Sequence, residues 1–212
     1  NYLHVEFSKE KLESAFVFCG QGPQYLEMGY DFCENYPIFL DSILKCDNLW
    51  KKISGESFIY TNKLFLPEFK EVEKNKLTIN EPIVAQPALF FFQVALVDLY
   101  FSYNIIPDAV IGHSAGELAA FYAAGAFDLK DCIKILYVRS VNQQKTVGMG
   151  NMLVVSTNVS KFEKYTTNLK SDKLELACEN DSKSIVISGN REQLDSLVKI
   201  LNKLNIFNTI IK

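Results

Sequence analysis

The chain has 212 residues, of which 48% are hydrophobic and 13% aromatic, so it can bury a sizeable core and form one domain with a small additional unit. Its 22 basic and 25 acidic residues give a formal net charge of −3 without long blocks of one sign, which argues against nucleic acid as a partner. The most apolar stretch, residues 87–103, is short for a bilayer crossing and carries Gln93 and Asp98. We therefore expect a buried helix there and no membrane partner.

Five cysteines are scattered through the chain without a Cys-x-x-Cys pair or neighbouring histidines. This spacing does not fit the usual zinc sites and predicts reduced thiols, as in a cytoplasmic protein. We expect neither a metal ion nor a bound cofactor. The chain begins at Asn1 without the basic and apolar layout of a secretion signal, so we expect it to be a piece of a longer protein.

The first part of the chain predicts a mixed arrangement of buried strands and helices. Up to Gly150 the expected order is βαααβαα, with strands at 15–19 and 108–111 and helices at 25–35, 37–50, 86–103, 114–124 and 129–146. The pattern over residues 53–81 is weak and charged. Short apolar strands separated by helices are typical of a parallel sheet.

The hydrophobic pattern changes after Gly150. We expect strands at 152–155, 174–178, 184–188 and 208–212, and helices at 160–169 and 191–204. The resulting order, βαββαβ, is that of the ferredoxin-like split motif. The sequence therefore predicts two domains, a core over residues 1–150 and a ferredoxin-like subdomain over residues 151–212.

A serine between two glycines follows the second expected strand and precedes a helix. In residues 112–116, Gly-His-Ser-Ala-Gly, the glycines permit the sharp turn of a nucleophile elbow, which lifts the Ser114 hydroxyl above the sheet edge. The N–H groups at the start of the helix can bind an oxyanion. This context predicts that Ser114 is the nucleophile of an acyl-transfer site on an α/β-hydrolase-like core with a parallel sheet.

A second glycine-rich segment, residues 20–22, lies at the carboxyl end of the first strand. Alone it is better explained as an ordinary turn, but beside Ser114 it becomes a candidate for a second oxyanion donor.

These segments resemble the acyltransferase domain of modular polyketide and fatty-acid synthases, which is akin to malonyl-CoA:acyl-carrier-protein transacylase. The resemblance rests, in matching order, on residues 16–25, 86–88, 111–120, 124–126, 137–140, 148–152 and 180–189. It implies a ping-pong cycle in which Ser114 takes a malonyl-type acyl group from coenzyme A and passes it to the phosphopantetheine thiol of an acyl carrier protein. The carrier protein and neighbouring synthase domains would be the partners, and the core over residues 1–150 would be incomplete.

The resemblance also implies roles for individual residues. Gln21 and Ala115 match the positions whose backbone N–H groups form the oxyanion hole, and Gln86 matches a glutamine that lines the pocket. Arg139 matches the arginine that holds the free carboxylate of a malonyl-type unit, which a guanidinium can do with two parallel hydrogen bonds. Methylmalonyl-type domains often carry glutamine after the serine, so the small Ala115 favours malonyl.

Two polar neighbours of Ser114 have simpler interpretations. Consecutive side chains at an elbow point apart, so we expect His113 to support the loop rather than to take the serine proton. Glu117 is expected to interact with the helix dipole in the first turn.

The general base is the point at which the sequence departs from the family. The family uses a histidine further along the chain than Lys212, and neither His4 nor His113 matches it. Residues 208–212 resemble the stretch that leads into that histidine, so we expect residues 1–212 alone to be acylated poorly or not at all. Two rival interpretations stay open: an α/β-hydrolase-type esterase with water as acceptor, and a truncated, non-catalytic docking domain of a synthase.

Overall fold

The computed structural model describes residues 13–70, 78–166 and 174–211. The chain forms two compact units, Asn1–Lys145 and Thr146–Lys212, and each has its own sheet and its own hydrophobic core. Both units combine helices with strands, which confirms the predicted α/β class.

The larger unit contains a parallel pair of strands, β1 (Ala15–Phe18) and β2 (Ala109–Gly112). The predicted parallel sheet is therefore confirmed. Phe18 pairs with Gly112, so both strands end at the same level. The carboxyl ends of parallel strands lie at the same edge of a sheet, so the loop after β1 and the turn after β2 leave the sheet side by side.

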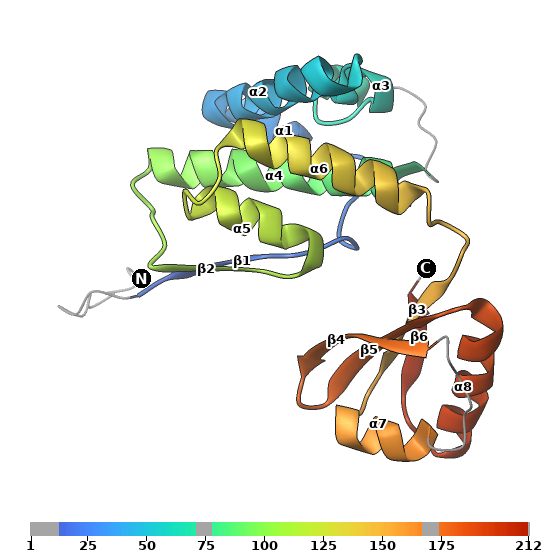
Figure 1. Cartoon of the computed structure of the whole chain (residues 1–212). Coiled ribbons are helices and arrows are strands. Elements are labelled where there is room, and N and C mark those ends of the chain that lie inside the picture. The colour runs from blue at the N-terminus through green and yellow to red at the C-terminus, as the bar shows by residue number, and fades with distance from the viewer. Residues whose placement is uncertain (1–12, 71–77, 167–173, 212) are drawn as a thin grey trace, which may run out of the picture. The chain divides into compact units, whose positions relative to one another are not determined.

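Helices cover one face of this strand pair, as Figure 1 shows. The long helices α2 (Pro37–Ser54) and α4 (Pro82–Ser102) pack against each other and against α6 (Leu129–Gln144). Their shared core consists of fully buried aromatic and aliphatic side chains, including Phe39, Ile43, Phe90, Phe91, Ile133 and Leu136. By length and composition α4 could cross a membrane, but 72% of its most apolar window is buried, as in a core helix.

The remaining helical segments of this unit are short. They are α1 (Tyr30–Asn35), α3 (Phe58–Asn62), α5 (Glu117–Ala123) and the 3₁₀ turns η1 (Pro67–Phe69), η2 (Thr78–Asn80) and η3 (Ser114–Gly116). Thus α3, η1 and η2 lie in the region whose sequence pattern is weak, and residues 71–77 of that region lie outside the described residues.

Several helix boundaries differ from those expected from the sequence, each for a local reason. The helix expected from residue 25 begins only at Tyr30, because Gly29 adopts a left-handed φ of 88° that a right-handed helix cannot continue through. The helix expected from residue 86 begins earlier, at Pro82, because proline suits the first helical turn. The helix expected from Ser114 starts as the 3₁₀ turn η3 and becomes α-helical at Glu117.

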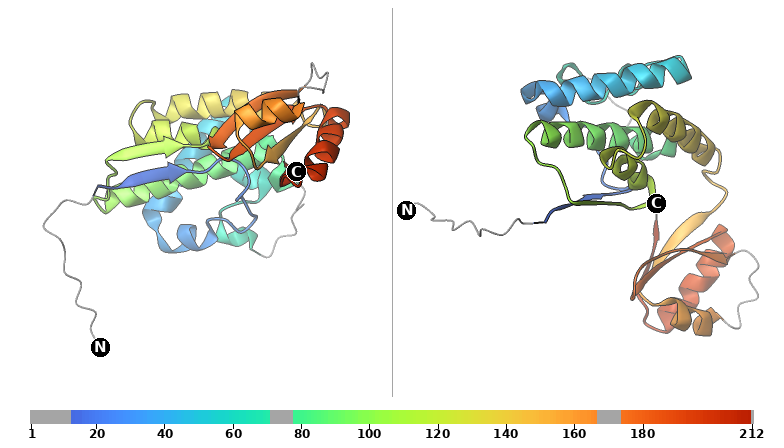
Figure 2. Two further views of the ribbon diagram at one scale, coloured as in Figure 1. Left: turned by 90° about the horizontal axis from the view of Figure 1, so that it is seen from below. Right: turned by 60° about the vertical axis from the view of Figure 1, so that its left-hand side comes forward.

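The smaller unit is a four-stranded antiparallel sheet with the strand order β4-β5-β3-β6. Its elements are β3 (Asn151–Val155), α7 (Val159–Thr166), β4 (Leu174–Asp181), β5 (Ser184–Gly189), α8 (Arg191–Lys203) and β6 (Asn208–Ile211). The order confirms the predicted βαββαβ motif. Figures 1 and 2 show α7 and α8 on one face of the sheet, where the core of this unit lies. The ends of the expected helix 160–169 and strand 208–212 lie outside the described residues.

Candidate active site

Ser114 stands at a sharp turn between β2 and η3. Its φ of 52° is in the left-handed region, which costs a residue other than glycine about 1–2 kcal/mol. The residue is exposed, so the strained turn leaves it accessible to a substrate. Backbone strain at an accessible serine between a strand and a helix is typical of a nucleophile elbow.

The two glycines of the turn are required by close packing. A Cβ on Gly116 would lie 2.3 Å from the carbonyl oxygen of Phe18, and a Cβ on Gly112 would lie 2.4 Å from Cα of Glu117. Both distances are far below van der Waals contact, so a side chain at either position would push the elbow away from β1 or from the start of α5.

The loop after β1 lies directly against the elbow. A Cβ on Gly20 would lie 3.0 Å from Cβ of Ser114 and 3.4 Å from the backbone nitrogen of Ala115. The backbone N–H of His113 also donates to the carbonyl oxygen of Phe18, at 2.9 Å. The structure therefore brings the Gly20–Gln21 loop, Ser114 and Ala115 together. An oxyanion hole built from two backbone segments requires this proximity.

Hydrogen bonds fix the shape of this loop. The side-chain amide of Gln21 donates to the carbonyl oxygen of Asn80 at 2.8 Å. Gln24 accepts from a backbone N–H of the loop at 2.7 Å and donates to the Asn80 side chain at 3.0 Å. From α4, the buried Gln93 donates to the carbonyl oxygen of Cys19 at 2.8 Å. A loop held in this way keeps its N–H groups preorganised.

Arg139 is half-buried on α6 and binds Gln86 of α4. Its Nη1 donates to Oε1 of Gln86 at 2.7 Å, and Gln86 is only 1% exposed. The Nε2 of Gln86 donates in turn to Oε1 of Gln143. An open depression of about 390 Å³ adjoins Arg139. Arg139 makes this one hydrogen bond to the described residues, so the rest of the guanidinium can bind a carboxylate.

Helix α4 connects the arginine with the serine turn. Gln86 and Gln93 are separated by about two helical turns, so they lie on one face of α4, about 10 Å apart along its axis. Gln86 binds Arg139, Gln93 binds the end of β1, and η3 packs against the same helix. α4 therefore contacts both Arg139 and the segments around Ser114.

His113 and Glu117 lie on either side of the turn η3. His113 is exposed, and its carbonyl oxygen accepts from the backbone N–H of Gly116 at 2.9 Å. The backbone N–H of His113 also donates to Phe18 at the end of β1. The His113 backbone is therefore bonded both to β1 and to the last residue of the turn. Glu117 is exposed at the first position of α5, where a negative charge interacts favourably with the helix dipole.

The buried cysteines are poor candidates for a nucleophile. Burial raises the pKa of Cys33 to about 12 and is the main cause that raises the pKa of Cys132 to about 11. Burial likewise raises the pKa of Cys46. Because the thiolate is the reactive form, all three are inert near neutral pH. Among the described residues, no three His, Cys, Asp or Glu side chains gather closely enough to hold a metal ion.

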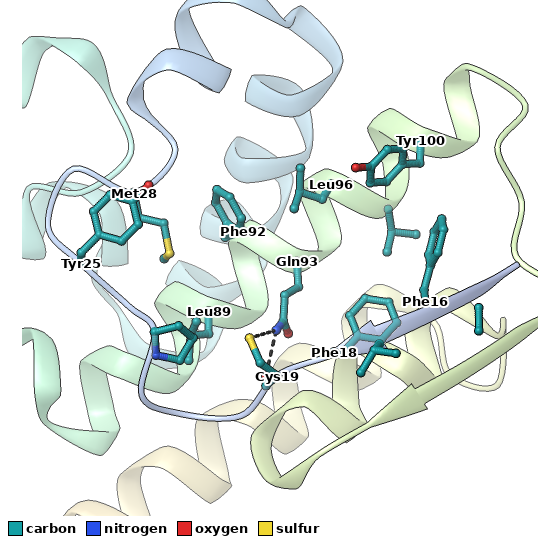
Figure 3. Close-up of a pocket in the computed structure, with 14 residues that line it drawn as sticks. Phe16, Phe18, Cys19, Tyr25, Met28, Leu89, Phe92, Gln93, Leu96 and Tyr100 are labelled. Carbon is teal, nitrogen blue, oxygen red and sulfur yellow. Dashed lines mark hydrogen bonds between the residues drawn. The ribbon is translucent and has the colours of Figure 1, made fainter. Parts of the chain in front are cut away.

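A separate apolar groove of about 480 Å³ lies between β1 and α4. Figure 3 shows its walls, which include Phe16, Phe92, Leu96 and Tyr100. The lining contains no arginine, lysine or histidine, so a carboxylate in this groove would have no opposite charge nearby. The groove is therefore a poor site for a dicarboxylic acyl group, although Cys19 links it to the loop beside Ser114.

The sequence pattern gave no role in the site to three polar residues of this region: Asn80, Gln93 and Gln143. Gln93 had a usable signal, since it is an amide within an apolar helix, about two turns after Gln86. Asn80 and Gln143 stand among other polar residues and carry no comparable signal.

Comparison with known proteins identifies the family. Residues 15–212 match the acyl transferase domain family. Probable polyketide synthase 1 of Dictyostelium discoideum is 39% identical over 199 residues, and probable polyketide synthase 22 of the same organism is 35% identical over 196 residues. The matches cover 93% and 92% of this chain but only 6% and 8% of those proteins. The chain thus spans less than a tenth of their length.

Solved structures share the fold. The acyltransferase domain from module 8 of the salinomycin polyketide synthase superimposes with a TM-score of 0.80 at 27% identity, covering 93% of this chain and 45% of that one. The malonyl-CoA:ACP transacylase of Synechocystis gives a TM-score of 0.73 at 25% identity, covering 95% of this chain and 62% of that one. From these matches and the serine elbow, the chain belongs to the acyl transferase domain family and is similar to the acyltransferase domains of polyketide synthases.

Proposed function

We propose that Ser114 accepts a malonyl-type acyl group from a coenzyme A thioester and passes it to the phosphopantetheine thiol of an acyl carrier protein, in polyketide or fatty-acid biosynthesis. The close approach of Gly20 to Ser114 and Ala115 carries the proposal, because it joins an accessible nucleophile to backbone donors from two segments. Similarity to polyketide synthases and to a malonyl-CoA:ACP transacylase supports this choice of donor and acceptor.

The proposed reaction has two matching halves. The hydroxyl oxygen of Ser114 attacks the thioester carbonyl while a base takes its proton, and the backbone N–H groups of Gln21 and Ala115 bind the oxyanion. Collapse of this intermediate forms the serine ester, breaks the C–S bond and releases coenzyme A, whose sulfur takes the proton back from the base. The phosphopantetheine thiol then attacks the ester by the same steps, and the serine hydroxyl is regenerated.

Arg139 is proposed to select acyl groups that carry a free carboxylate. The planar guanidinium can bind that carboxylate with two parallel hydrogen bonds, while its bond to the buried Gln86 fixes the arginine from the protein side. Lysine would supply the charge without the fixed orientation. The small Ala115 supports malonyl over methylmalonyl as the unit transferred.

The base and the cellular setting complete the proposal. His113 is the one histidine among the described residues, and we assign it a supporting role because its backbone bonds hold the elbow. The resemblance to the family supports a histidine outside the described residues as the base, and we propose that residues 1–212 alone react poorly. The carrier protein and neighbouring synthase domains are the proposed partners. The free thiols of all five cysteines support a cytoplasmic location.

The test is mass spectrometry of the protein extended through the next histidine, after incubation with malonyl-CoA. One malonyl group should appear on the peptide that contains Ser114 and should be absent in Ser114→Ala. Arg139→Ala should lower malonyl transfer roughly 10- to 100-fold, because hydrogen bonds to a charged group are lost, without a matching loss for acetyl groups. A folded protein that forms no serine adduct would contradict the proposal. Release of free malonate at a rate independent of the carrier would indicate an esterase instead.

A further inference from the structure

A chain of side-chain amides lies behind Arg139. Gln86 stands between Arg139 and Gln143, accepting from the guanidinium with Oε1 and donating to Gln143 with Nε2. Arg139 and Gln143 are one turn apart on α6, so both point toward the same part of α4. Gln86 therefore binds two positions of one helix through the two ends of its amide.

The amide of Gln86 has only one orientation that satisfies both neighbours. A flip would turn its NH₂ group toward the guanidinium, placing donor against donor, and would turn its oxygen away. Gln86 is 1% exposed, so water cannot readily replace a lost partner. The oxygen of Gln143, which accepts from the NH₂ group, therefore opposes the flip.

We propose that Gln143 is a positioning residue for Arg139 and acts through Gln86. By holding the Gln86 oxygen toward Nη1, it fixes the plane of the guanidinium and thereby the direction in which the remaining N–H groups meet a carboxylate. Gln143 thus sets how strongly the site prefers carboxylated over neutral acyl groups. This inference rests on the proposed role of Arg139 in binding the acyl carboxylate.

The neighbouring Gln144 provides a matched control. It also joins α6 to α4, because it accepts from the N–H of Ile83 at 3.2 Å and donates to Glu81 at 3.1 Å. These contacts hold the start of α4 and do not involve Arg139. Loss of Gln144 therefore reproduces the loss of an interhelical glutamine without disturbing the amide chain.

The experiment measures kcat/KM for malonyl-CoA and acetyl-CoA in the protein extended through the next histidine. Gln143→Leu should lower the ratio of malonyl to acetyl specificity about tenfold, mainly through KM for malonyl-CoA, whereas Gln144→Leu should leave the ratio unchanged. In a Gln86→Leu background, Gln143→Leu should change the ratio by less than twofold, since its effect passes through Gln86.

The outcomes separate the two proposals. Equal losses for both acyl groups would assign Gln143 a purely structural role, and the same loss with and without Gln86 would show that its effect does not pass through Gln86. Either result would overturn the inference while leaving the proposed function intact. A wild-type protein that shows no preference for malonyl would overturn both proposals.

Discussion

Ser114 adopts a backbone angle that glycine reaches at almost no cost, yet the proposed reaction needs a side-chain hydroxyl at this position. The left-handed φ of 52° turns the chain away from β2 and leaves the residue exposed. The strain must be offset by neighbouring contacts, and the close packing of Gly112 and Gly116 supplies them. Stability and the proposed reaction therefore make opposite demands on this residue.

Replacing the serine should reveal this opposition. Ser114→Gly should unfold with a free energy about 1 kcal/mol higher than Ser114→Ala, because only glycine relieves the left-handed angle. Neither variant should form the acyl adduct. Urea unfolding of both variants provides the comparison. Equal stability of the two would show that φ at this position carries no strain.

The sequence predicts a part of the site from its pattern only where all residues of that part lie in one short segment. The elbow and the loop at Gln21 follow from glycines placed after apolar strands, and the structure indeed sets the two against each other. The contact of Arg139 with Gln86 joins two helices far apart in the sequence. Hydrophobic periodicity predicts that each segment is a helix, but it does not predict which residues of one helix face the other. The contacts of Gln86 with Arg139 and with Gln143 could therefore not be predicted.

At the level of elements, long periodic helices and short apolar strands were predictable, whereas α3 was not. This helix has a single turn and little amphipathic pattern, so it depends on contacts from elsewhere. Asp47 on α2 supplies them. One carboxylate oxygen accepts from the hydroxyl of Ser57 at 2.7 Å, and the other accepts from the backbone N–H of Ile59 at 3.1 Å. Ser57 is also a local N-cap, because its hydroxyl oxygen accepts from the N–H of Tyr60 at 3.2 Å, but the contact from Asp47 comes from another helix and leaves no signal in the sequence of α3.

Asp47→Ala should therefore lower the free energy of unfolding by about 2 kcal/mol, because it leaves the N–H of the buried Ile59 and the hydroxyl of the half-buried Ser57 without this acceptor. Asp47→Asn keeps an oxygen for the N–H of Ile59 and should cost about half as much. Asp41→Ala on the same helix removes only an exposed ion pair with Lys45 and should change stability by less than about 0.5 kcal/mol. If Asp41→Ala and Asp47→Ala had equal effects in urea unfolding, α3 would not depend on this cap.

On the scale of the whole molecule, the two units were predictable to different degrees. The smaller unit forms its six elements through short connections, and their order alone matches a known motif. In the larger unit, the order of elements predicts a parallel pair but not its register. Yet the register decides whether the loop after β1 reaches Ser114. The pairing of Phe18 with Gly112 could be learned only from the structure.

The smaller unit should fold by itself. Its core of Leu153, Val155, Ile185, Ile187, Leu194, Leu197 and Leu201 is fully buried and comes entirely from residues 146–212. A unit of this size buries only about 60% of its unfolded surface, so its stability should be no more than a few kcal/mol.

A single core substitution should then suffice to unfold this unit. Leu194→Ala should cost about 2–5 kcal/mol and abolish the cooperative transition of isolated residues 146–212, followed by circular dichroism in urea. Lys199→Ala, at an exposed position of the same helix, should preserve the transition, because no buried contact is removed. An isolated wild-type unit without such a transition would mean that the seven side chains of this core do not stabilise the sheet without the rest of the chain.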